Sequence, residues 1–381
     1  MVKKKRIALI LSGGGARAAY QVGVLLAIRE LLGNPVGNPF AILCGTSAGA
    51  INAATLACYS HNFAAAVEAL TGVWRNMRAG QIYRADPLGM CLSGIRWLGA
   101  LLFGWIVKYS PRSILDNRPL RKLLENALDF STIQHSLDNG SLYAVSITAS
   151  GYATGDSVSF YQAHPEIKSW RRAHRVGCRT TLSVDHLMAS SAIPFVFPAL
   201  YLNREFFGDG SMRQLAPISP AIHLGAEKVL IVGVAQLAEP LRRQSSTTYP
   251  SLAQIAGHAM ASIFLDSLGS DIERMERINR TLSKVPSELR DGGDISLRPV
   301  QSLTIAPSER LEPLAAQHVH SLPWAVKILL RGLGAMSRRG SALASYLLFE
   351  KPYTDALINL GHKDAMAMRT EIEAFFRADH T

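Results

Sequence analysis

The first sixty residues alternate short apolar runs with glycine-rich turns and helical patterns. Each apolar run has the length of a buried strand, and each is followed by small residues and then by apolar positions at helical spacing. Two such units lie in succession, over residues 6–11, 12–15 and 16–32 and then over residues 40–44, 45–49 and 50–59. Two strand–turn–helix units in a row predict a parallel sheet covered by helices.

Further apolar segments extend this plan. Additional strands of the same sheet are predicted over residues 141–150, 157–162 and 228–235. Beyond these strands the pattern becomes helical, with loops over residues 242–250 and 286–299. We therefore expect a catalytic domain over residues 1–240 and a mainly helical region over residues 241–381 that packs on it.

Composition narrows the kinds of partner. The formal net charge of +11 favours contact with polyanions, either nucleic acid or an anionic membrane surface. The chain has no zinc-finger spacing and no RNA-binding aromatic signature, so we expect no nucleic-acid partner. Four cysteines lie far apart, and the apolar stretch near residue 7 is too short for a signal peptide, which favours a cytoplasmic protein. Nothing in the sequence indicates an oligomeric state.

The second turn carries a nucleophile motif. Gly45-Thr46-Ser47-Ala48-Gly49 fits G-x-S-x-G, in which small residues let the chain turn sharply from strand to helix and present the serine hydroxyl. The helix N-terminus that follows favours developing negative charge. The motif therefore predicts Ser47 as a nucleophile, with Gly45 and Gly49 as the glycines of the elbow.

The first turn supplies unobstructed backbone N–H groups. Gly13, Gly14 and Gly15 lie between strand and helix, where their N–H groups can stabilise an oxyanion. The same glycines fit part of a dinucleotide-binding fingerprint, but the next strand ends without the acidic residue that this fingerprint requires. We therefore favour an oxyanion hole over a nucleotide site.

A third segment, residues 206–211, places Asp209 between two glycines. Four segments occur in the order typical of the patatin-like phospholipase family: the glycine loop (residues 12–17), the elbow (45–49), residues 189–198 and residues 206–211. The chain resembles this family over residues 6–234, and the joint occurrence is far more specific than any one motif. One departure is Ser211, which stands where Gly or Ala is usual.

The resemblance implies a fold and a mechanism. The fold would be a three-layer α/β/α patatin-like fold with a mostly parallel sheet and a helical C-terminal region. Asp209 would accept the proton of Ser47 directly, without a histidine, in the hydrolysis of lipid esters, and no cofactor or metal would be needed. Burial must raise the pKa of Asp209 for this task, and Phe206, Phe207 and Met212 are neighbours that could exclude water. Arg17 would either contact an anionic head group or bind the glycine loop to the sheet.

Two other functions stay open at this point. A Ser-His-Asp esterase would place its histidine after the acid, and His223 and His258 both follow Asp209. Neither lies in a distinctive loop. A lipid-surface binding protein could keep the fold without turnover, but the presence of both Ser47 and Asp209 argues against it.

Two segments have the character of membrane-contacting elements. Residues 88–107 contain only one charged residue and, within a possible insertion over residues 88–110, predict a buried helix, a cover over the site or a membrane-facing element. A helix after Ser321 would group Leu322 and Val326 with Leu329, Leu333 and Met336, opposite Lys327, Arg331 and Arg338. This helix is either an ordinary surface helix or one that lies on anionic lipid. We expect a lipid substrate and peripheral contact with an anionic membrane.

Overall fold

One sheet forms the centre of the protein. The structure is a computed structural model and describes residues 5–84, 113–236, 252–263, 267–286, 297–332, 335 and 341–377. Within these residues the strands are β1 (Ile7–Leu11), β2 (Ile42–Thr46), β3 (Ala144–Gly151), β4 (Ser157–Ala163), β5 (Trp170–Arg172), β6 (Arg175–Arg179), β7 (Leu200–Leu202), β8 (Glu205–Asp209), β9 (Lys228–Val232) and β10 (Gln301–Ile305).

The sheet is mostly parallel in its central part. Its strand order is β10-β9-β1-β2-β3-β4-β6-β5, with β8 paired to β3 and β7 paired to β8. The five strands from β10 to β3 run parallel, whereas β4 and β8 are both antiparallel to β3. The predicted α/β architecture is confirmed, and so are the expected strands before each turn.

Helices cover both faces of the sheet. Those described are α1 (Ala19–Leu31), α2 (Ala48–Cys58), α3 (Phe63–Arg75), α4 (Ala79–Ile82), α6 (Arg118–Ala127), α7 (Ser131–Asp138), α8 (Val184–Ser190), α9 (Ser219–His223), α10 (Leu252–Ala261), α11 (Ser267–Leu282), α13 (Leu311–His318), α14 (Trp324–Gly332), α15 (Ser341–Leu347), α16 (Lys351–Ala367) and α17 (Arg369–Phe376). Short 3-10 turns are η1 (Gly15–Ala18), η2 (Gly210–Met212) and η4 (Val319–Ser321).

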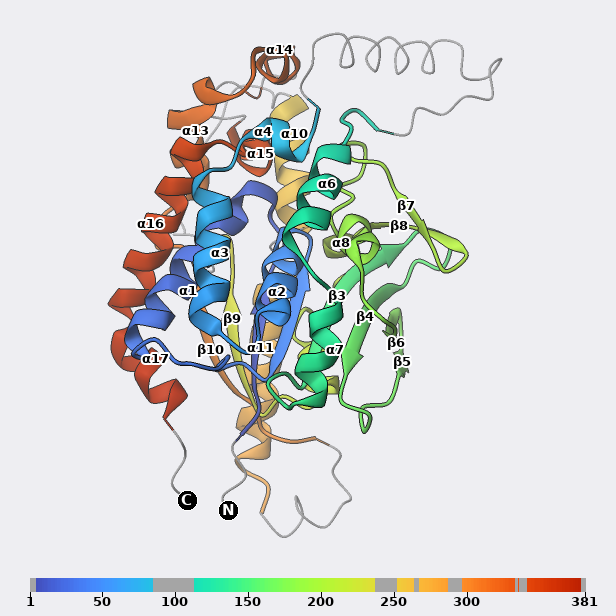
Figure 1. Ribbon diagram of the computed structural model, residues 1–381, viewed down its shortest axis with the longest axis vertical. Helices are drawn as coiled ribbons and strands as arrows, with labels where there is room; N and C mark the ends of the chain where they lie inside the picture. Colours follow the sequence, from blue (N-terminus) through green and yellow to red (C-terminus); the bar gives the residue numbers. More distant parts are fainter. Residues whose placement is uncertain are drawn as a thin grey trace.

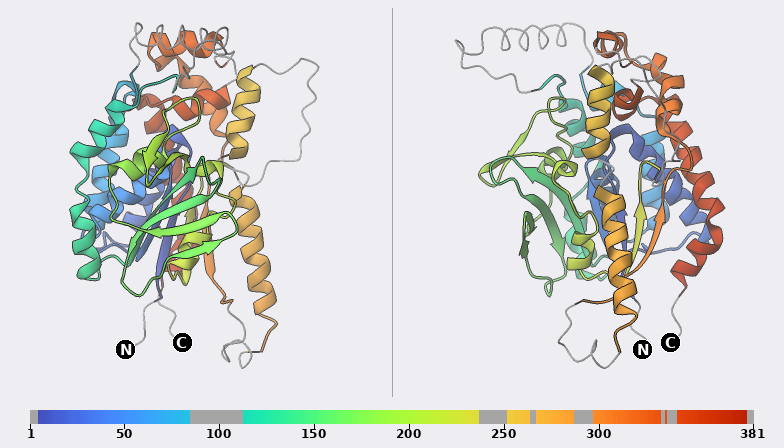
Figure 2. Two further views of the ribbon diagram at one scale, coloured as in Figure 1. Left: turned by 90° about the vertical axis from the view of Figure 1, so that its right-hand side faces the viewer. Right: turned by 180° about the vertical axis from the view of Figure 1, so that it is seen from behind.

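The side chains of each strand point alternately to the two faces of the sheet, and this explains the three layers of the fold. Leu9 and Leu11 of β1 pack into a core with α1, α2, α3 and α16, whereas Ala8 and Ile10 pack with α9 and α11 on the other face. Successive side chains of a strand point to opposite faces, so an entirely apolar strand requires cover on both sides. Figure 1 shows α2 and α3 in front of the sheet, and the right-hand view of Figure 2, from behind, shows α11 on the opposite face.

The C-terminal third is joined closely to the rest. Strand β10 extends the central sheet beside β9, which the expectation of a mainly helical region did not include. Helix α16 crosses α1 at two glycines: a Cβ on Gly23 would lie 1.9 Å from the carbonyl oxygen of Ile358, and one on Gly361 would lie 2.1 Å from that of Tyr20. These glycines let the two backbones touch, so α16 is fitted to the catalytic layer. A domain boundary near residue 240 stays a proposal.

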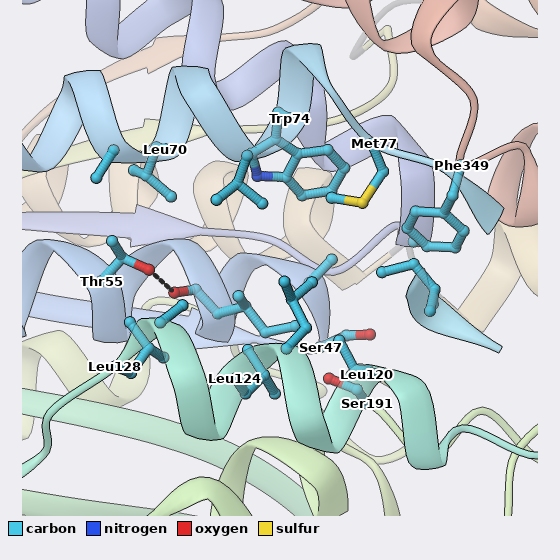
Figure 3. Close-up of a pocket in the computed structure, with 18 of the residues that line it drawn as sticks. Ser47, Thr55, Leu70, Trp74, Met77, Leu120, Leu124, Leu128, Ser191 and Phe349 are labelled. Atoms are coloured by element: carbon cyan, nitrogen blue, oxygen red, sulfur yellow. Dashed lines mark hydrogen bonds between the residues drawn. The ribbon is translucent and has the colours of Figure 1, made fainter. Parts of the chain in front are cut away.

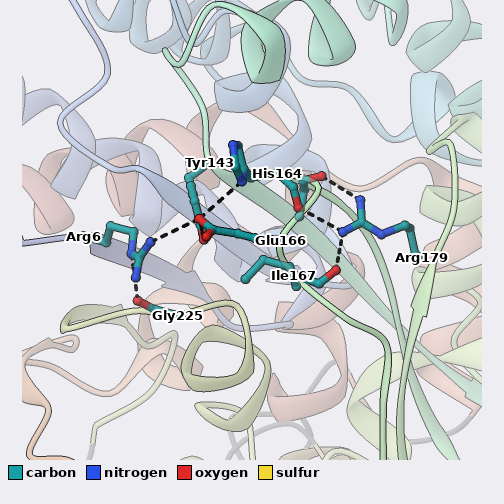
Figure 4. Close-up of polar contacts among 8 residues, drawn as sticks. Arg6, Tyr143, His164, Glu166, Ile167, Arg179 and Gly225 are labelled. Carbon is teal, nitrogen blue, oxygen red and sulfur yellow. Dashed lines mark hydrogen bonds and ion pairs between the residues drawn. The ribbon is translucent and has the colours of Figure 1, made fainter.

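A polar cluster holds the amino-terminal edge of the sheet, before β1 and β3 begin (Figure 4). Glu166 accepts a 2.8 Å hydrogen bond from the Tyr143 hydroxyl and lies 3.9 Å from the Arg6 guanidinium. The guanidinium of Arg179 donates to the carbonyl oxygens of Ala163, at 2.7 Å, and of Ile167. These contacts fix the connection between β4 and β5 and leave the opposite, carboxyl edge free for chemistry.

Of the two segments predicted to contact a membrane, the structure describes only part of the second, the helix after Ser321. Residues 88–107 lie outside the described residues. Of the predicted apolar face, Leu322, just before α14, and Val326 are buried, 2% and 0% exposed, and Leu329 is half-buried. Leu333, Met336 and Arg338 lie outside the described residues. The exposed apolar side chains of α14 are Trp324 and Ile328, each 58% exposed. The described part of the predicted face therefore packs on the core, as in an ordinary surface helix. Among the described residues, none of the helices has both the length and the apolar character that crossing a bilayer requires.

Candidate active site

The elbow around Ser47 is a sharp turn between β2 and α2. Ser47 has φ 53° and ψ −129°, outside the conformations that a non-glycine residue usually adopts. Glycines on either side make this possible, because a Cβ on Gly45 would lie 2.5 Å from the Gly49 carbonyl oxygen, and one on Gly49 would lie 2.3 Å from that of Leu11. Ser47 is 2% exposed, so its hydroxyl faces a cleft and not open solvent.

A second serine holds the elbow in this conformation. The backbone N–H of Ser47 donates to Ser190 Oγ at 2.8 Å, and the Ser190 hydroxyl donates to the carbonyl oxygen of Thr148 at 2.6 Å. Ser190 therefore bridges the strained turn to β3. It lies in the segment 189–198 that carries part of the family resemblance, but no sequence spacing indicates this contact.

Strand register brings Asp209 to Ser47. Strand β2 pairs with β3 as far as Thr46, which lies opposite Thr148. At the next position of β3, Ala149 pairs with Asp209 of β8, while the other side of β3 is occupied by β4. Strand β8 therefore follows β2 along the same side of β3. This places Asp209 of β8 next to the end of β2, where Ser47 begins the turn into α2.

Asp209 is a completely buried carboxyl group. It is 0% exposed, and burial raises its pKa to about 6 in spite of the Ser47 hydroxyl and the Ser211 N–H, which favour the charged form. Oδ1 accepts a 2.9 Å hydrogen bond from the Ser211 backbone N–H, whereas Oδ2 has no partner that meets hydrogen-bond geometry. The Ser47 hydroxyl is thus near enough to affect the pKa of Asp209, but its geometry does not meet the criteria for a hydrogen bond.

The neighbours of Asp209 partly match expectation. Ser211, the departure from the family pattern, donates its backbone N–H to the carboxylate of Asp209, and its hydroxyl also favours the charged form of that carboxylate. Phe207 is 3% exposed and contributes to the dry environment, but Phe206 is 53% exposed and does not. The two phenylalanines face opposite sides because they are adjacent in a strand.

The glycine loop presents free donors beside the elbow. No hydrogen bond from the N–H of Gly13 or Gly14 is found within the described residues. Gly15, with φ 56°, lines the same cleft as Ser47. The elbow packs on this loop, because the space for a Cβ on Gly49 is filled by the carbonyl oxygens of Leu11 and Ser12. The structure thus brings together the three glycines, Ser47 and Asp209.

Arg17 has a structural role, but its partners differ from those expected from the sequence. It is 1% exposed, and its guanidinium lies 2.9 Å from Glu312 of α13. An arginine at this depth, already paired with a carboxylate, is engaged within the protein. It binds the glycine loop to the C-terminal helices and not, as expected, to the sheet.

The cleft at Ser47 is long and apolar (Figure 3). Helix α2 forms its floor, α3 one wall and α6 the other. Its volume is about 830 Å³, part of which is open to solvent. The lining includes Ile51 and Thr55 of α2, Leu70, Val73 and Trp74 of α3, Leu120, Leu123 and Leu124 of α6, and also Tyr59, Met77, Leu128, Ser191, Ile193, Phe197 and Phe349.

The candidate histidines lie elsewhere. His223 stacks on Trp170 of β5, with ring centroids 4.9 Å apart, and burial together with Arg172 and Arg175 lowers its pKa to about 4. His258 is an exposed residue of α10. Neither histidine lines the cleft that contains Ser47.

Comparison with known proteins identifies the family of this chain. Residues 9–222 match the patatin-like phospholipase family, and since the match spans more than half of the chain, the protein belongs to that family. The cGAMP-activated phospholipase of Pseudomonas aeruginosa (strain BWHPSA011 / Pa011) is 30% identical over 211 residues, which are 55% of this chain and 53% of that protein. The chain thus aligns with about half the length of this relative.

Two solved structures are similar over nearly the whole chain. VipD from Legionella pneumophila has a TM-score of 0.35 and 10% identity, and the alignment covers 97% of this chain and 67% of that one. Human GIVD cytosolic phospholipase A2 has a TM-score of 0.44 and 12% identity, with 98% of this chain and 62% of that chain covered.

Proposed function

We propose that this protein is a lipid acyl hydrolase that uses Ser47 as nucleophile and Asp209 as its direct base. The observation that supports the proposal is the proximity of Ser47, which has a strained backbone, to Asp209, a buried carboxyl group of raised pKa. The two residues are close because β8 follows β2 along the same side of β3. A base works best when its pKa lies near the working pH, and burial provides this for Asp209. The apolar cleft beside the serine fits an acyl chain.

The reaction proceeds through an acyl-enzyme. Ser47 Oγ attacks the ester carbonyl carbon while its proton passes to Asp209, and the N–H groups of Gly13 and Gly14 stabilise the oxyanion. Collapse of the intermediate breaks the bond to the alcohol, which leaves with the proton from Asp209. Water then attacks the acyl-enzyme, gives a proton to Asp209 and releases the fatty acid, after which the proton returns to Ser47.

The cleft indicates the kind of acyl group. Its floor runs along α2 from Ser47 to Tyr59, about 18 Å at the rise of an α-helix. An extended chain advances roughly 1.2 Å per bond, so this length accommodates an acyl chain of about 15 carbons. We therefore propose long-chain glycerophospholipids or lysophospholipids as substrates.

We also propose that the protein attaches to anionic membranes as a peripheral cytoplasmic protein. Trp324 and Ile328 lie one turn apart on α14, both 58% exposed, and the exposed Arg331 follows them. Indole and aliphatic side chains beside a cation suit the boundary between head groups and acyl chains. The described cysteines Cys44, Cys58 and Cys178 are free thiols, which fits a reducing compartment.

Vesicle flotation tests the membrane proposal. We expect tighter binding to anionic than to neutral vesicles, weakening with salt and on Trp324→Ala substitution. Equal partitioning to both kinds of vesicle would contradict it.

Hydrolysis of phospholipids and of a water-soluble ester tests the dyad. We expect Ser47→Ala and Asp209→Asn to lose activity while remaining folded by thermal melt. His223→Gln and His258→Gln are the matched controls and should keep it, since both side chains lie outside the cleft. Activity in folded Ser47→Ala would refute the nucleophile, and loss in a histidine variant alone would favour a Ser-His-Asp esterase. An inactive wild type that still binds vesicles would favour a lipid-surface binding protein.

A further inference from the structure

The outer side of the glycine loop is built from residues beyond the part that matches the family. A Cβ on Gly15 would lie 2.2 Å from the carbonyl oxygen of Tyr346 in α15. Gly15 also has φ 56°, a conformation that favours glycine. The backbone of α15 therefore packs directly on the loop that carries the oxyanion donors.

Arg17 fixes this contact through its side chain. Its Nε donates to Ser345 Oγ at 2.8 Å and its Nη2 to Glu312 Oε1 at 2.9 Å. The guanidinium lies over the ring of Tyr346, 4.2 Å from its centroid. A planar guanidinium held at two edges and one face has little rotational freedom. Because Arg17 follows Gly15 within η1, its position sets that of the loop.

The Arg17–Glu312 pair is an ionised contact in a mostly dry environment. Burial by itself would raise the pKa of Glu312, but the charge of Arg17, hydrogen bonds and the charge of Arg310 bring that pKa below its usual value. An arginine 1% exposed would be costly without such a partner. The pair is therefore maintained at neutral pH.

The same C-terminal segment reaches the acyl cleft. The carbonyl oxygen of Leu347 accepts a 2.9 Å hydrogen bond from the Tyr83 hydroxyl. Phe349, two residues later, lines the cleft and stacks on Trp74 with ring centroids 6.3 Å apart. Residues 345–349 thus run from the glycine loop to the acyl-binding wall.

We propose that helices α13 and α15 are part of the active site, because they hold the oxyanion loop in place through the positioning residue Arg17. The catalytic unit then extends past residue 222, where the family match ends, to Phe349. This inference rests on the proposed function, since the loop is assigned to oxyanion stabilisation. It gives a role to a C-terminal region for which the sequence indicated none.

A paired substitution separates positioning from folding. Removing only Glu312 would leave the Arg17 charge buried and could unfold the protein, whereas replacing both members of a buried ion pair by apolar residues often preserves stability. The main variant is therefore Arg17→Met with Glu312→Leu, and Ser345→Ala is a milder second variant. Glu309→Gln is the matched control, because Glu309 is a nearby exposed acid paired with Lys363 on the surface.

We expect the double variant to melt cooperatively while kcat falls on the order of 100-fold, the effect of misplacing a catalytic group by about 1 Å. Affinity for a trifluoromethyl ketone, which forms an oxyanion, should fall by a similar factor, while affinity for a non-hydrolysable ether lipid should stay unchanged. A merely structural role would not separate these two affinities. Ser345→Ala should show the same pattern more weakly.

Amide hydrogen exchange gives a readout that does not need activity. The peptide covering residues 11–18 should exchange faster in the double variant and in Ser345→Ala, but not in Glu309→Gln. If wild type and the folded double variant have equal kcat and equal exchange, the proposal is overturned while the proposed function stands. If the wild type itself hydrolyses no ester, the proposed function fails, and exchange in the loop still decides whether α13 and α15 hold it.

Discussion

Trp74, in the wall of the acyl cleft, donates its indole N–H to Asn52 Oδ1 at 2.9 Å. The amide of Asn52 in turn donates to Gln21 Oε1 at 2.9 Å, and that of Gln21 donates to the carbonyl oxygen of Ser12 at 2.8 Å. Asn52 and Gln21 are both 0% exposed. A continuous buried chain of hydrogen bonds therefore connects the wall that would touch the acyl chain to the loop that would hold the oxyanion.

The stability of the protein should depend on each donor of this series of buried hydrogen bonds. Trp74→Phe keeps an aromatic wall but leaves Asn52 Oδ1 without its indole partner, so we expect the free energy of unfolding to fall by about 1–3 kcal/mol. Urea denaturation measures this change. The control is Trp324→Phe, a substitution at an exposed tryptophan, which should leave stability unchanged. Equal stability of the two variants would mean that the buried bond contributes nothing.

Asp209 should link stability and activity to pH in opposite directions. Its pKa is raised from 3.8 to about 6 by burial, so the folded state binds this proton more tightly than the unfolded state. Stability from this group is complete below about pH 4 and is lost as pH rises through 6, in total about 3 kcal/mol. Conversely, kcat/KM should rise with pH around 6 as the base ionises.

Asp209→Asn tests the stability part of this link. By urea denaturation the variant should be more stable than wild type at pH 8, by up to about 3 kcal/mol, and the difference should shrink toward pH 4. Asp138→Asn, at an exposed carboxylate on α7, is the comparison. A wild type as stable as Asp209→Asn at pH 8 would contradict a costly buried charge.

A bulky side chain part of the way along the cleft should limit the accepted chain length. Thr55 lies eight residues along α2 from Ser47, about 12 Å. Thr55→Phe should therefore block chains longer than about ten carbons while leaving short esters as substrates. Thr71→Phe is a matched control, because Thr71 makes the same bond to the carbonyl four residues earlier but does not line the cleft. Unchanged hydrolysis of a 16-carbon ester by Thr55→Phe would show that acyl chains bind elsewhere.

The elbow should not tolerate a methyl group at Gly49. A Cβ there would lie 2.3 Å from the carbonyl oxygen of Leu11, so Gly49→Ala must push α2 away from β1. We expect loss of activity and a lower melting temperature. At Gly72, on the exposed side of α3, no atom lies within 4 Å of an added Cβ, and Gly72→Ala should stabilise by roughly 0.5–1 kcal/mol. Thermal melts and ester assays of both variants test this prediction. Wild-type activity and melting temperature in Gly49→Ala would contradict it.

Local patterns in the sequence predicted the elements of the site but not their supports. Ser47 and the glycines were predictable because a strand–turn–helix pattern imposes small residues at fixed offsets, and the fold followed from the same pattern. The contacts of Ser190 and Asn52 join residues far apart in the chain, and no periodic pattern in the sequence predicts such contacts. Phe206 was misplaced because two adjacent strand residues cannot both face inward.

The C-terminal third shows the same limit. Glu312 looks like any helix-surface acid in the sequence, and only the fold places it against Arg17. Strand β10 was not predicted because its sequence, QSLTI, is half polar, as suits a strand at the edge of the sheet.

The spread of the site along the chain also bears on biosynthesis. Contacts of the glycine loop and the cleft reach from Gly14 to Phe349, so a ribosome must translate most of the chain before they can all form. At about 5–20 residues per second, the interval between the synthesis of Asp209 and that of Phe349 is roughly 7 to 28 seconds. Throughout this interval the proposed nucleophile and base have been synthesised, but the helices that pack on the glycine loop have not. We therefore expect an unfinished or truncated chain to be much less active than the full-length chain.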